Sequence, residues 1–190
     1  MKSLFLKFTV FFLVAFFCKS ALSQTSEMFN SSTYSVKIGD SCIIPQEYYE
    51  SRWYGSVLSP ETTSACDSIY AFLKQNPSVS IAIIVHSDFR PILMGNDTLT
   101  MRRANRLKQE ILKHGDIDSN RIIAIGMGYS QLRVVTKEIH KQYKFLPVGQ
   151  VLSAEFCKTL VSNRQNYEIA IGLNRRAVVK IVENYAEPKF

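Results

Sequence analysis

The spacing of hydrophobic residues changes along the chain and predicts alternating helices and strands. Ser59-Pro60-Glu61 is a helix start, because serine caps the first turn, proline suits its first position and glutamate lies near the positive end of the helix dipole. Apolar residues then recur at helical spacing until Asn76-Pro77, where the predicted helix ends. The apolar, β-branched run at 79–85 predicts a buried strand.

The remaining expected elements complete an alternating order. They are a first strand within 37–55, a second helix over 99–113, a strand over 122–125 and a last strand over 177–183. Residues 129–166 have weak periodicity and are longer than an ordinary connection, so we interpret them as an insertion with a short helix near 153–161. This order predicts an α+β fold, a two-layer β-α-β-α-β sandwich with both helices on one face of a mixed sheet and an insertion before the last strand.

Residues 1–23 have the pattern of a secretory signal peptide. Lys2 and Lys7 precede an apolar run, and Ala21 and Ser23 match a cleavage site. The apolar run is shorter than the roughly 20 residues that span a membrane. Removal of the segment takes away three lysines and lowers the formal net charge from +7 to +4. We therefore expect an exported chain with a flexible lead-in at 24–40, a domain at 41–190 and no transmembrane segment.

Composition narrows the classes of function. With 46% hydrophobic and 21% charged residues, the chain is typical of a globular protein, and its mature charge is too small to favour nucleic-acid binding. The histidines are scattered and no Cys/His spacing indicates zinc, so no metal or cofactor is expected. Cys42, Cys66 and Cys157 remain after signal removal. In an oxidising compartment we expect one disulfide among them and one buried thiol, with the pairing left open.

One arginine of the second predicted helix lies on its apolar side. At about 100° per residue, Arg103 falls roughly 40° from Leu99, inside the apolar stripe. A guanidinium aimed at that side needs an anion, because burying it unpaired is costly. It can pair with an internal carboxylate such as Asp88, which follows the 79–85 strand. Alternatively, Asp88 and Arg103 can hold the ammonium and carboxylate of a zwitterion. Spacing alone leaves both interpretations open.

Several segments match a known family in order and spacing. His86-Ser87-Asp88 and the run Asn96-Asp97-Thr98-Leu99-Thr100-Met101-Arg102-Arg103-Ala104 resemble the (G)HTD…NxxLSxxRA signature of OmpA-like peptidoglycan-binding domains. Gly126-Met127-Gly128-Tyr129-Ser130 resembles their GxGxS turn. Asn174-Arg175-Arg176-Ala177-Val178 resembles their terminal NRRV strand. The resemblance covers most of the chain that follows the predicted lead-in.

The resemblance implies a non-catalytic module that binds the stem peptide of peptidoglycan. In the family, the aspartate of HTD and the arginine of RA hold the amino and carboxylate groups of diaminopimelate, and these positions are Asp88 and Arg103 here. The asparagine of NxxLS and the first arginine of NRR line the same site, which adds Asn96 and Arg175. A periplasmic location in a Gram-negative bacterium is also implied, with association with the outer membrane or other envelope proteins as a further expectation.

The chain departs from the family pattern around the expected site. Phe89-Arg90-Pro91-Ile92 replaces a segment that contains a glycine in the family, so Pro91 removes an amide donor and Arg90 can compete for Asp88. Arg133 stands where a proline often follows the GxGxS turn. With the long insertion, these changes support an alternative function, in which an envelope protein of this fold binds a protein partner.

An enzyme is a third interpretation of the sequence. His86 and Asp88 lie two positions apart at a predicted strand end, where they can form an acid–base pair or bind a metal. No third ligand or nucleophile stands at a suitable spacing, so we do not expect catalysis.

Overall fold

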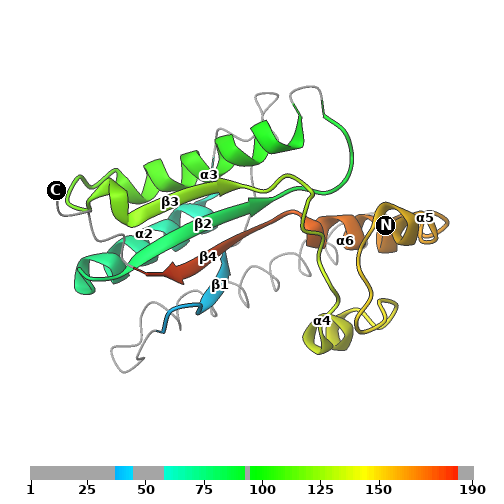
Figure 1. The fold of residues 1–190 in the computed structure, drawn as a ribbon. Coiled ribbons are helices and arrows are strands. Elements are labelled where there is room, and N and C mark those ends of the chain that lie inside the picture. The colour runs from blue at the N-terminus through cyan, green and yellow to red at the C-terminus, as the bar shows by residue number, and fades with distance from the viewer. Residues whose placement is uncertain (1–36, 45–57, 93–94, 184–190) are drawn as a thin grey trace, which may run out of the picture.

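The fold is a four-stranded sheet with two long helices on one face and a helical insertion at one end (Figure 1). The computed structural model describes residues 37–44, 58–92 and 95–183. The strand order is β1 (Ser41–Ile44), β4 (Arg176–Val182), β2 (Ser80–His86) and β3 (Ile122–Gly126). Strand β2 is parallel to β3 and antiparallel to β4, which is antiparallel to β1. The predicted α+β sandwich with a mixed sheet is confirmed.

Two predictions from the N-terminal sequence lie outside the described residues. They are the signal peptide at 1–23 and residues 24–36 of the lead-in. These assignments, like the domain boundaries that follow from them, stay predictions. Within the described part of the chain, no helix is both long and apolar enough to cross a membrane.

Helix α2 (Pro60–Gln75) begins and ends where its sequence predicts. Ser59 Oγ accepts a hydrogen bond from the Thr62 backbone N at 3.2 Å, a cap whose loss costs about 1 kcal/mol. At the other end, Asn76 Nδ2 donates to the carbonyl oxygen of Phe72 at 2.8 Å. Polar side chains at both ends therefore fix the length of this helix.

Helix α3 (Asn96–Leu112) begins earlier than the predicted helix at 99–113. Gly95 precedes it with a φ of 79°, a backbone conformation that glycine adopts without steric cost. This turn adds Asn96 to the helix, and it places Asn96 next to the loop that follows β2.

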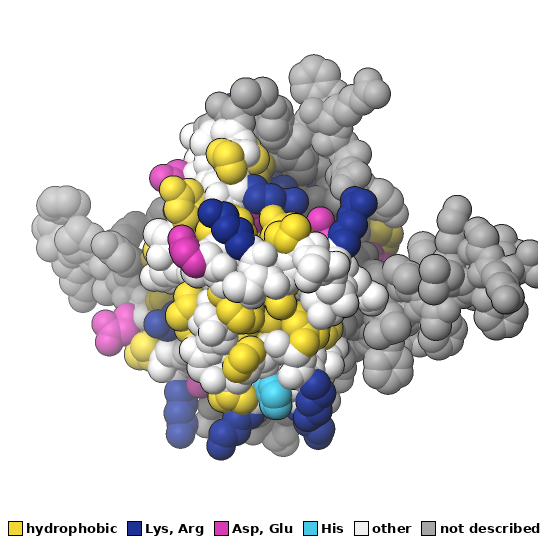
Figure 2. Space-filling model, turned by 90° about the vertical axis from the view of Figure 1, so that its right-hand side faces the viewer, with side chains coloured by type: hydrophobic (Ala, Val, Ile, Leu, Met, Phe, Trp, Pro, Cys, Tyr) yellow, Lys and Arg dark blue, Asp and Glu magenta, His cyan; other side chains and the backbone are white. Residues whose placement is uncertain are grey.

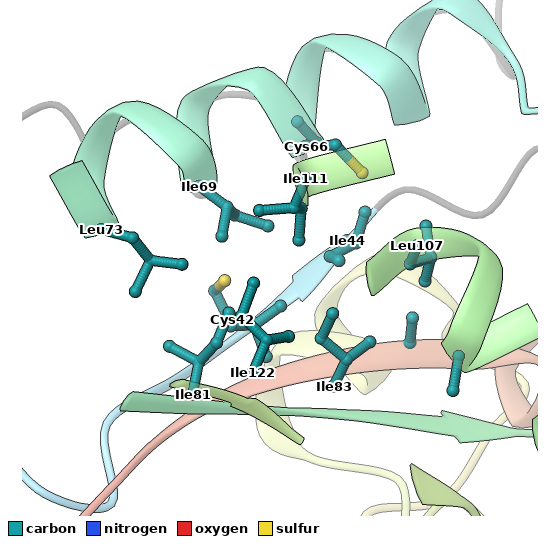
Figure 3. Close-up of a cluster of buried hydrophobic side chains, with 14 of the residues drawn as sticks. Cys42, Ile44, Cys66, Ile69, Leu73, Ile81, Ile83, Leu107, Ile111 and Ile122 are labelled. Carbon is teal, nitrogen blue, oxygen red and sulfur yellow. The ribbon is translucent and has the colours of Figure 1, made fainter. Parts of the chain in front are cut away.

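The main core lies between the sheet and helices α2 and α3 (Figure 3). Alternate strand residues point toward the helices, and each helix contributes one apolar stripe. The large, fully buried side chains of this core include Ile44, Ile69, Leu73, Ile81, Ile83, Leu107, Ile111 and Ile122. Each such side chain stabilises the fold by about 1.5–3 kcal/mol relative to an exposed one. We call this cluster the sheet–helix core.

The expectation of a disulfide among the mature cysteines is wrong. Cys42, Cys66 and Cys157 are free, buried thiols. Cys42 and Cys66 lie in the sheet–helix core (Figure 3), whereas Cys157 belongs to the insertion. Burial raises the pKa of both Cys42 and Cys66 to about 12. These thiols therefore act as small apolar side chains.

The insertion contains more helix than its sequence predicts, and its last helix extends past the expected end at residue 166. The helix expected near 153–161 corresponds to α5 (Ala154–Lys158), and α4 (Lys137–Gln142) and α6 (Arg164–Asn174) flank it. Its own core, which we call the insertion core, consists of Val135, Ile139, Leu146, Leu152, Cys157, Ala170 and Ile171. Figure 1 shows these helices at the end of the sheet where β2 and β3 end and β4 begins.

Candidate ligand-binding site

Asp88 lies in the loop after β2, and two arginines enclose its carboxylate. The Arg90 backbone N and Nε donate to Asp88 Oδ1 at 2.9 and 3.0 Å, and Arg90 Nη2 donates to Oδ2 at 2.8 Å. From the end of α6, Arg175 Nη1 donates to the same Oδ2 at 2.8 Å. Asp88 itself is buried. Two residues that the sequence assigned to one site are thus joined by a hydrogen bond.

The charge of Asp88 follows from these contacts. Burial alone raises the pKa of this carboxyl, but the hydrogen bonds from Arg90 and Arg175 more than offset it and hold the pKa below its ordinary value. Asp88 is therefore a carboxylate at neutral pH. The side chains of Arg90 and Arg175 are 46% and 37% exposed, so both can exchange these contacts with solvent or a ligand.

Asn96 holds the Asp88 loop against the start of α3. Its Nδ2 donates to the carbonyl oxygen of Arg90 at 3.2 Å and, more weakly, to that of Asp88 at 3.5 Å. The side chain is buried. Asn96 is therefore a positioning residue for the loop in this structure.

Arg103 points inward from α3, as its position on the helix predicts. Its Nε is buried, whereas the neighbouring Arg102 is exposed. Arg90 and Arg175 both donate hydrogen bonds to the Asp88 carboxylate. The pairing of Asp88 with Arg103 that the sequence allowed stays a prediction.

The turn formed by Gly126-Met127-Gly128 packs against the beginning of α3. Thr100 Oγ1 accepts a hydrogen bond from the Gly128 backbone N at 2.9 Å. A Cβ at Gly126 would collide with the backbone of Met101, and a Cβ at Gly128 would collide with the Asp97 side chain. Both glycines are needed for this close approach, which fixes α3 relative to the ends of β2 and β3.

The insertion core reaches the Asp88 loop through Phe89, which packs against it. The pKa of the adjacent Arg90 is raised, first by its hydrogen bonds to Asp88 and further by the charge of Glu168 on α6. The insertion therefore supports the segment that departs from the family pattern. Sequence reasoning identified Arg90 as a competitor for Asp88, but it missed the anchoring of Phe89, because no local pattern shows a contact between distant segments.

A match to a known family covers most of this site. Residues 55–144 match the sequence model of the OmpA family. The resemblance to OmpA-like domains is confirmed. The matched segment contains Asp88, Asn96 and Arg103, but it ends within the insertion, so Arg175 lies beyond it.

Solved structures of low sequence identity share the OmpA-like fold. A putative MotB-like protein from Desulfovibrio vulgaris matches with a TM-score of 0.51 and 14% identity, covering 88% of this chain and 94% of that chain. The periplasmic domain of Helicobacter pylori MotB matches with a TM-score of 0.52 and 11% identity, covering 80% of this chain and 82% of that chain. At these identities the similarity shows the fold alone. A search among curated proteins gives no match.

Proposed function

We propose that this OmpA-like domain binds the stem peptide of peptidoglycan in the periplasm, without catalysis, and so anchors or organises the cell envelope. The observation that carries the proposal is the arrangement around Asp88. Hydrogen bonds join Asp88 to Arg175 and its loop to Asn96, and Arg103 points inward from the helix that Asn96 begins. The OmpA family match and the fold shared with a periplasmic MotB domain support it.

The recognised group in this proposal is the zwitterionic end of diaminopimelate. Asp88 would accept hydrogen bonds from its ammonium group, and Arg103 would donate to its carboxylate. Charge-assisted hydrogen bonds of this kind contribute about 1.5–3 kcal/mol each when water is excluded. Asn96 would keep the Asp88 loop in position, and Arg175 would hold the second oxygen of Asp88.

Binding of an ammonium group requires Arg90 to release Asp88. Among the described residues, Arg90 supplies three of the four hydrogen bonds to this carboxylate, two of them from its guanidinium. Because its side chain is 46% exposed, the guanidinium can rotate into solvent. The ligand then exchanges one charge-assisted contact for another, so the net affinity is the difference between the two.

The proposal is tested by co-sedimentation of residues 24–190 with purified diaminopimelate-type sacculi. We expect the parent chain to pellet with the sacculi, and Asp88→Ala and Arg103→Ala to stay in solution. Arg102→Ala is the matched control, because Arg102 is exposed and precedes Arg103 directly. Circular dichroism confirms that each variant is folded. Pelleting of folded Asp88→Ala and Arg103→Ala at the parent level would overturn the proposal.

A second candidate function is binding of a protein partner through the insertion. Its exposed hydrophobic side chains are Tyr129, Val134, Val148, Val151 and Val161. Figure 2 shows hydrophobic side chains gathered on this end of the molecule, with lysines and arginines around them. Such a surface favours a partner with an apolar, acidic face. If the parent chain does not pellet with sacculi, and Val148→Asp abolishes co-purification of an envelope protein, this function replaces the first.

A further inference from the structure

A second polar cluster lies on the sheet face opposite helices α2 and α3. His86 at the end of β2 is paired with Arg176 at the start of β4. Opposite residues of an antiparallel pair project to the same face of a sheet. Their neighbours Val85 and Ala177 belong to the sheet–helix core, so His86 and Arg176 face the other side.

The guanidinium of Arg176 is fixed by the backbone of two segments. Its Nη1 donates to the carbonyl oxygen of Asn174 at 3.2 Å, and its Nη2 donates to that of Gln131 at 3.0 Å. Asn174 Oδ1 in turn accepts a hydrogen bond from the backbone N of Arg133 at 2.7 Å. These contacts bring Arg133, from the start of the insertion, next to Arg176.

The cluster carries positive charge and open hydrogen-bonding capacity. Among the described residues, no acceptor receives a hydrogen bond from the Arg133 guanidinium, and no carboxylate forms an ion pair with Arg133 or Arg176. His86 is 3% exposed, and its buried Nδ1 has no hydrogen-bond partner. The cluster therefore brings together a buried imidazole and two arginines whose charge no described carboxylate balances.

The electrostatics agree with this arrangement. Burial and the charge of Arg133 lower the pKa of Arg176 to about 10. Burial, Arg176 and Arg133 lower the pKa of His86 to about 4, so its imidazole is neutral at pH 7. The charge of Arg133 thus disfavours the charged form of Arg176 by repulsion, and both arginines disfavour a charged His86. An anion placed between them would relieve this repulsion.

We propose that Arg133, Arg176 and His86 form a binding site for a small oxyanion, a carboxylate or phosphate group, separate from the Asp88 site. The planar guanidinium suits both groups, because its N–H donors match paired oxygens. Arg133 supplies the donors that the structure leaves available, Arg176 supplies a fixed charge, and His86 presents a buried ring nitrogen. The site does not rest on peptidoglycan binding.

The test follows the three histidine side chains by NMR during titration of residues 24–190 with sodium phosphate and, separately, sodium acetate. Sodium chloride at matched ionic strength is the reference for both. We expect a saturable shift of the His86 ring signals with at least one oxyanion, without a comparable shift at His114 or His140. We also expect the bound anion to raise the pKa of His86. The anion whose titration saturates at the lower concentration shows whether the site prefers a phosphate or a carboxylate group.

Variants of the arginines decide whether the response belongs to this site. Arg133→Gln should weaken the binding at least tenfold, whereas Arg102→Gln, which changes an exposed arginine of α3, should leave it unchanged. If Arg133→Gln does not fold, Arg133→Lys replaces it. Lysine retains the positive charge but lacks the paired N–H donors of the guanidinium, so it should also weaken the binding. Equal shifts in chloride, or an unchanged response in a folded Arg133 variant, would overturn the proposal.

Discussion

The sheet–helix core and the insertion core stabilise different parts of the candidate site. The first joins regular strands to helices of 16 and 17 residues, and its packing positions the ends of β2, β3 and α3. The second is built from helices of 6, 5 and 11 residues, and Phe89 of the Asp88 loop packs against it. The sheet–helix core therefore sets where Asp88 and Arg103 lie, whereas the insertion influences which group Asp88 contacts.

The largest expected effect comes from removing side-chain volume in the sheet–helix core. Leu107→Ala should lower the free energy of unfolding by about 2–5 kcal/mol, because it leaves a cavity between α3 and the sheet. Urea denaturation measures this loss. Leu146→Ala, in the insertion core, is the matched substitution, and hydrogen exchange should show its loss of protection in α4–α6 while α2 and α3 stay protected. Equal loss of protection in both regions would contradict a division into two cores.

The next effect concerns the close approach of the glycine turn to α3. Gly126→Ala should lower the free energy of unfolding by about 1–3 kcal/mol, because the new methyl group collides with the Met101 backbone. Gly149→Ala, in the insertion, is the control. Its Cβ meets open space, so only its positive φ opposes the change, at about 1 kcal/mol. Chemical denaturation of both variants compares them, and a smaller loss at Gly126 would contradict the packing described.

The regular part of the fold was predictable from sequence because its patterns are local. Hydrophobic periodicity and end signals such as Ser59 and Asn76 predicted the two long helices and the strands to within a few residues. Helix α6 was missed, because its buried residues pack against segments distant in sequence, which no local pattern shows. The prediction of a disulfide was wrong for a related reason. The redox state of a compartment and the number of cysteines do not determine where the fold places the thiols.

The candidate site was predictable only in part. The motif resemblance identified Asp88, Asn96, Arg103 and Arg175, and the structure joins three of them through hydrogen bonds. The enclosure of Asp88 depends on the path of α6, and the pairing of His86 with Arg176 depends on strand register. Neither is a local property of the sequence.

Acid should weaken the fold through Asp88. Because its folded pKa lies below the unfolded value of about 3.9, its contribution is present above that pH and is lost as pH falls through the folded pKa. Asp88→Asn should therefore lower the free energy of unfolding by about 1–2 kcal/mol at pH 7. This loss is smaller than for a fully buried ion pair, because solvent screens the partly exposed guanidiniums of both arginines. Urea denaturation at pH 7 and pH 3 checks this. The deficit should shrink at pH 3, and a constant deficit would contradict the ion pairs.

The buried thiols give a smaller, chemical readout that compares the two cores. At pH 8 a thiol-specific reagent should leave Cys42 and Cys66 unmodified in the native chain, because burial blocks access and raises the pKa of both to about 12. Burial also raises the pKa of Cys157 in the insertion core, so it should react slowly, and faster in Leu146→Ala. Mass spectrometry resolves the three sites. Rapid labelling of Cys42 or Cys66 in native protein would contradict the core described.

The central claim, that Asp88 binds the ligand's ammonium group in place of Arg90, is tested by calorimetric titration with a diaminopimelate-containing stem peptide. Arg90→Ala removes the competing guanidinium, so we expect it to bind about tenfold more tightly than the parent chain, equivalent to about 1.4 kcal/mol. Folded Asp88→Ala should show no binding. Weaker or unchanged binding by folded Arg90→Ala would contradict the claim.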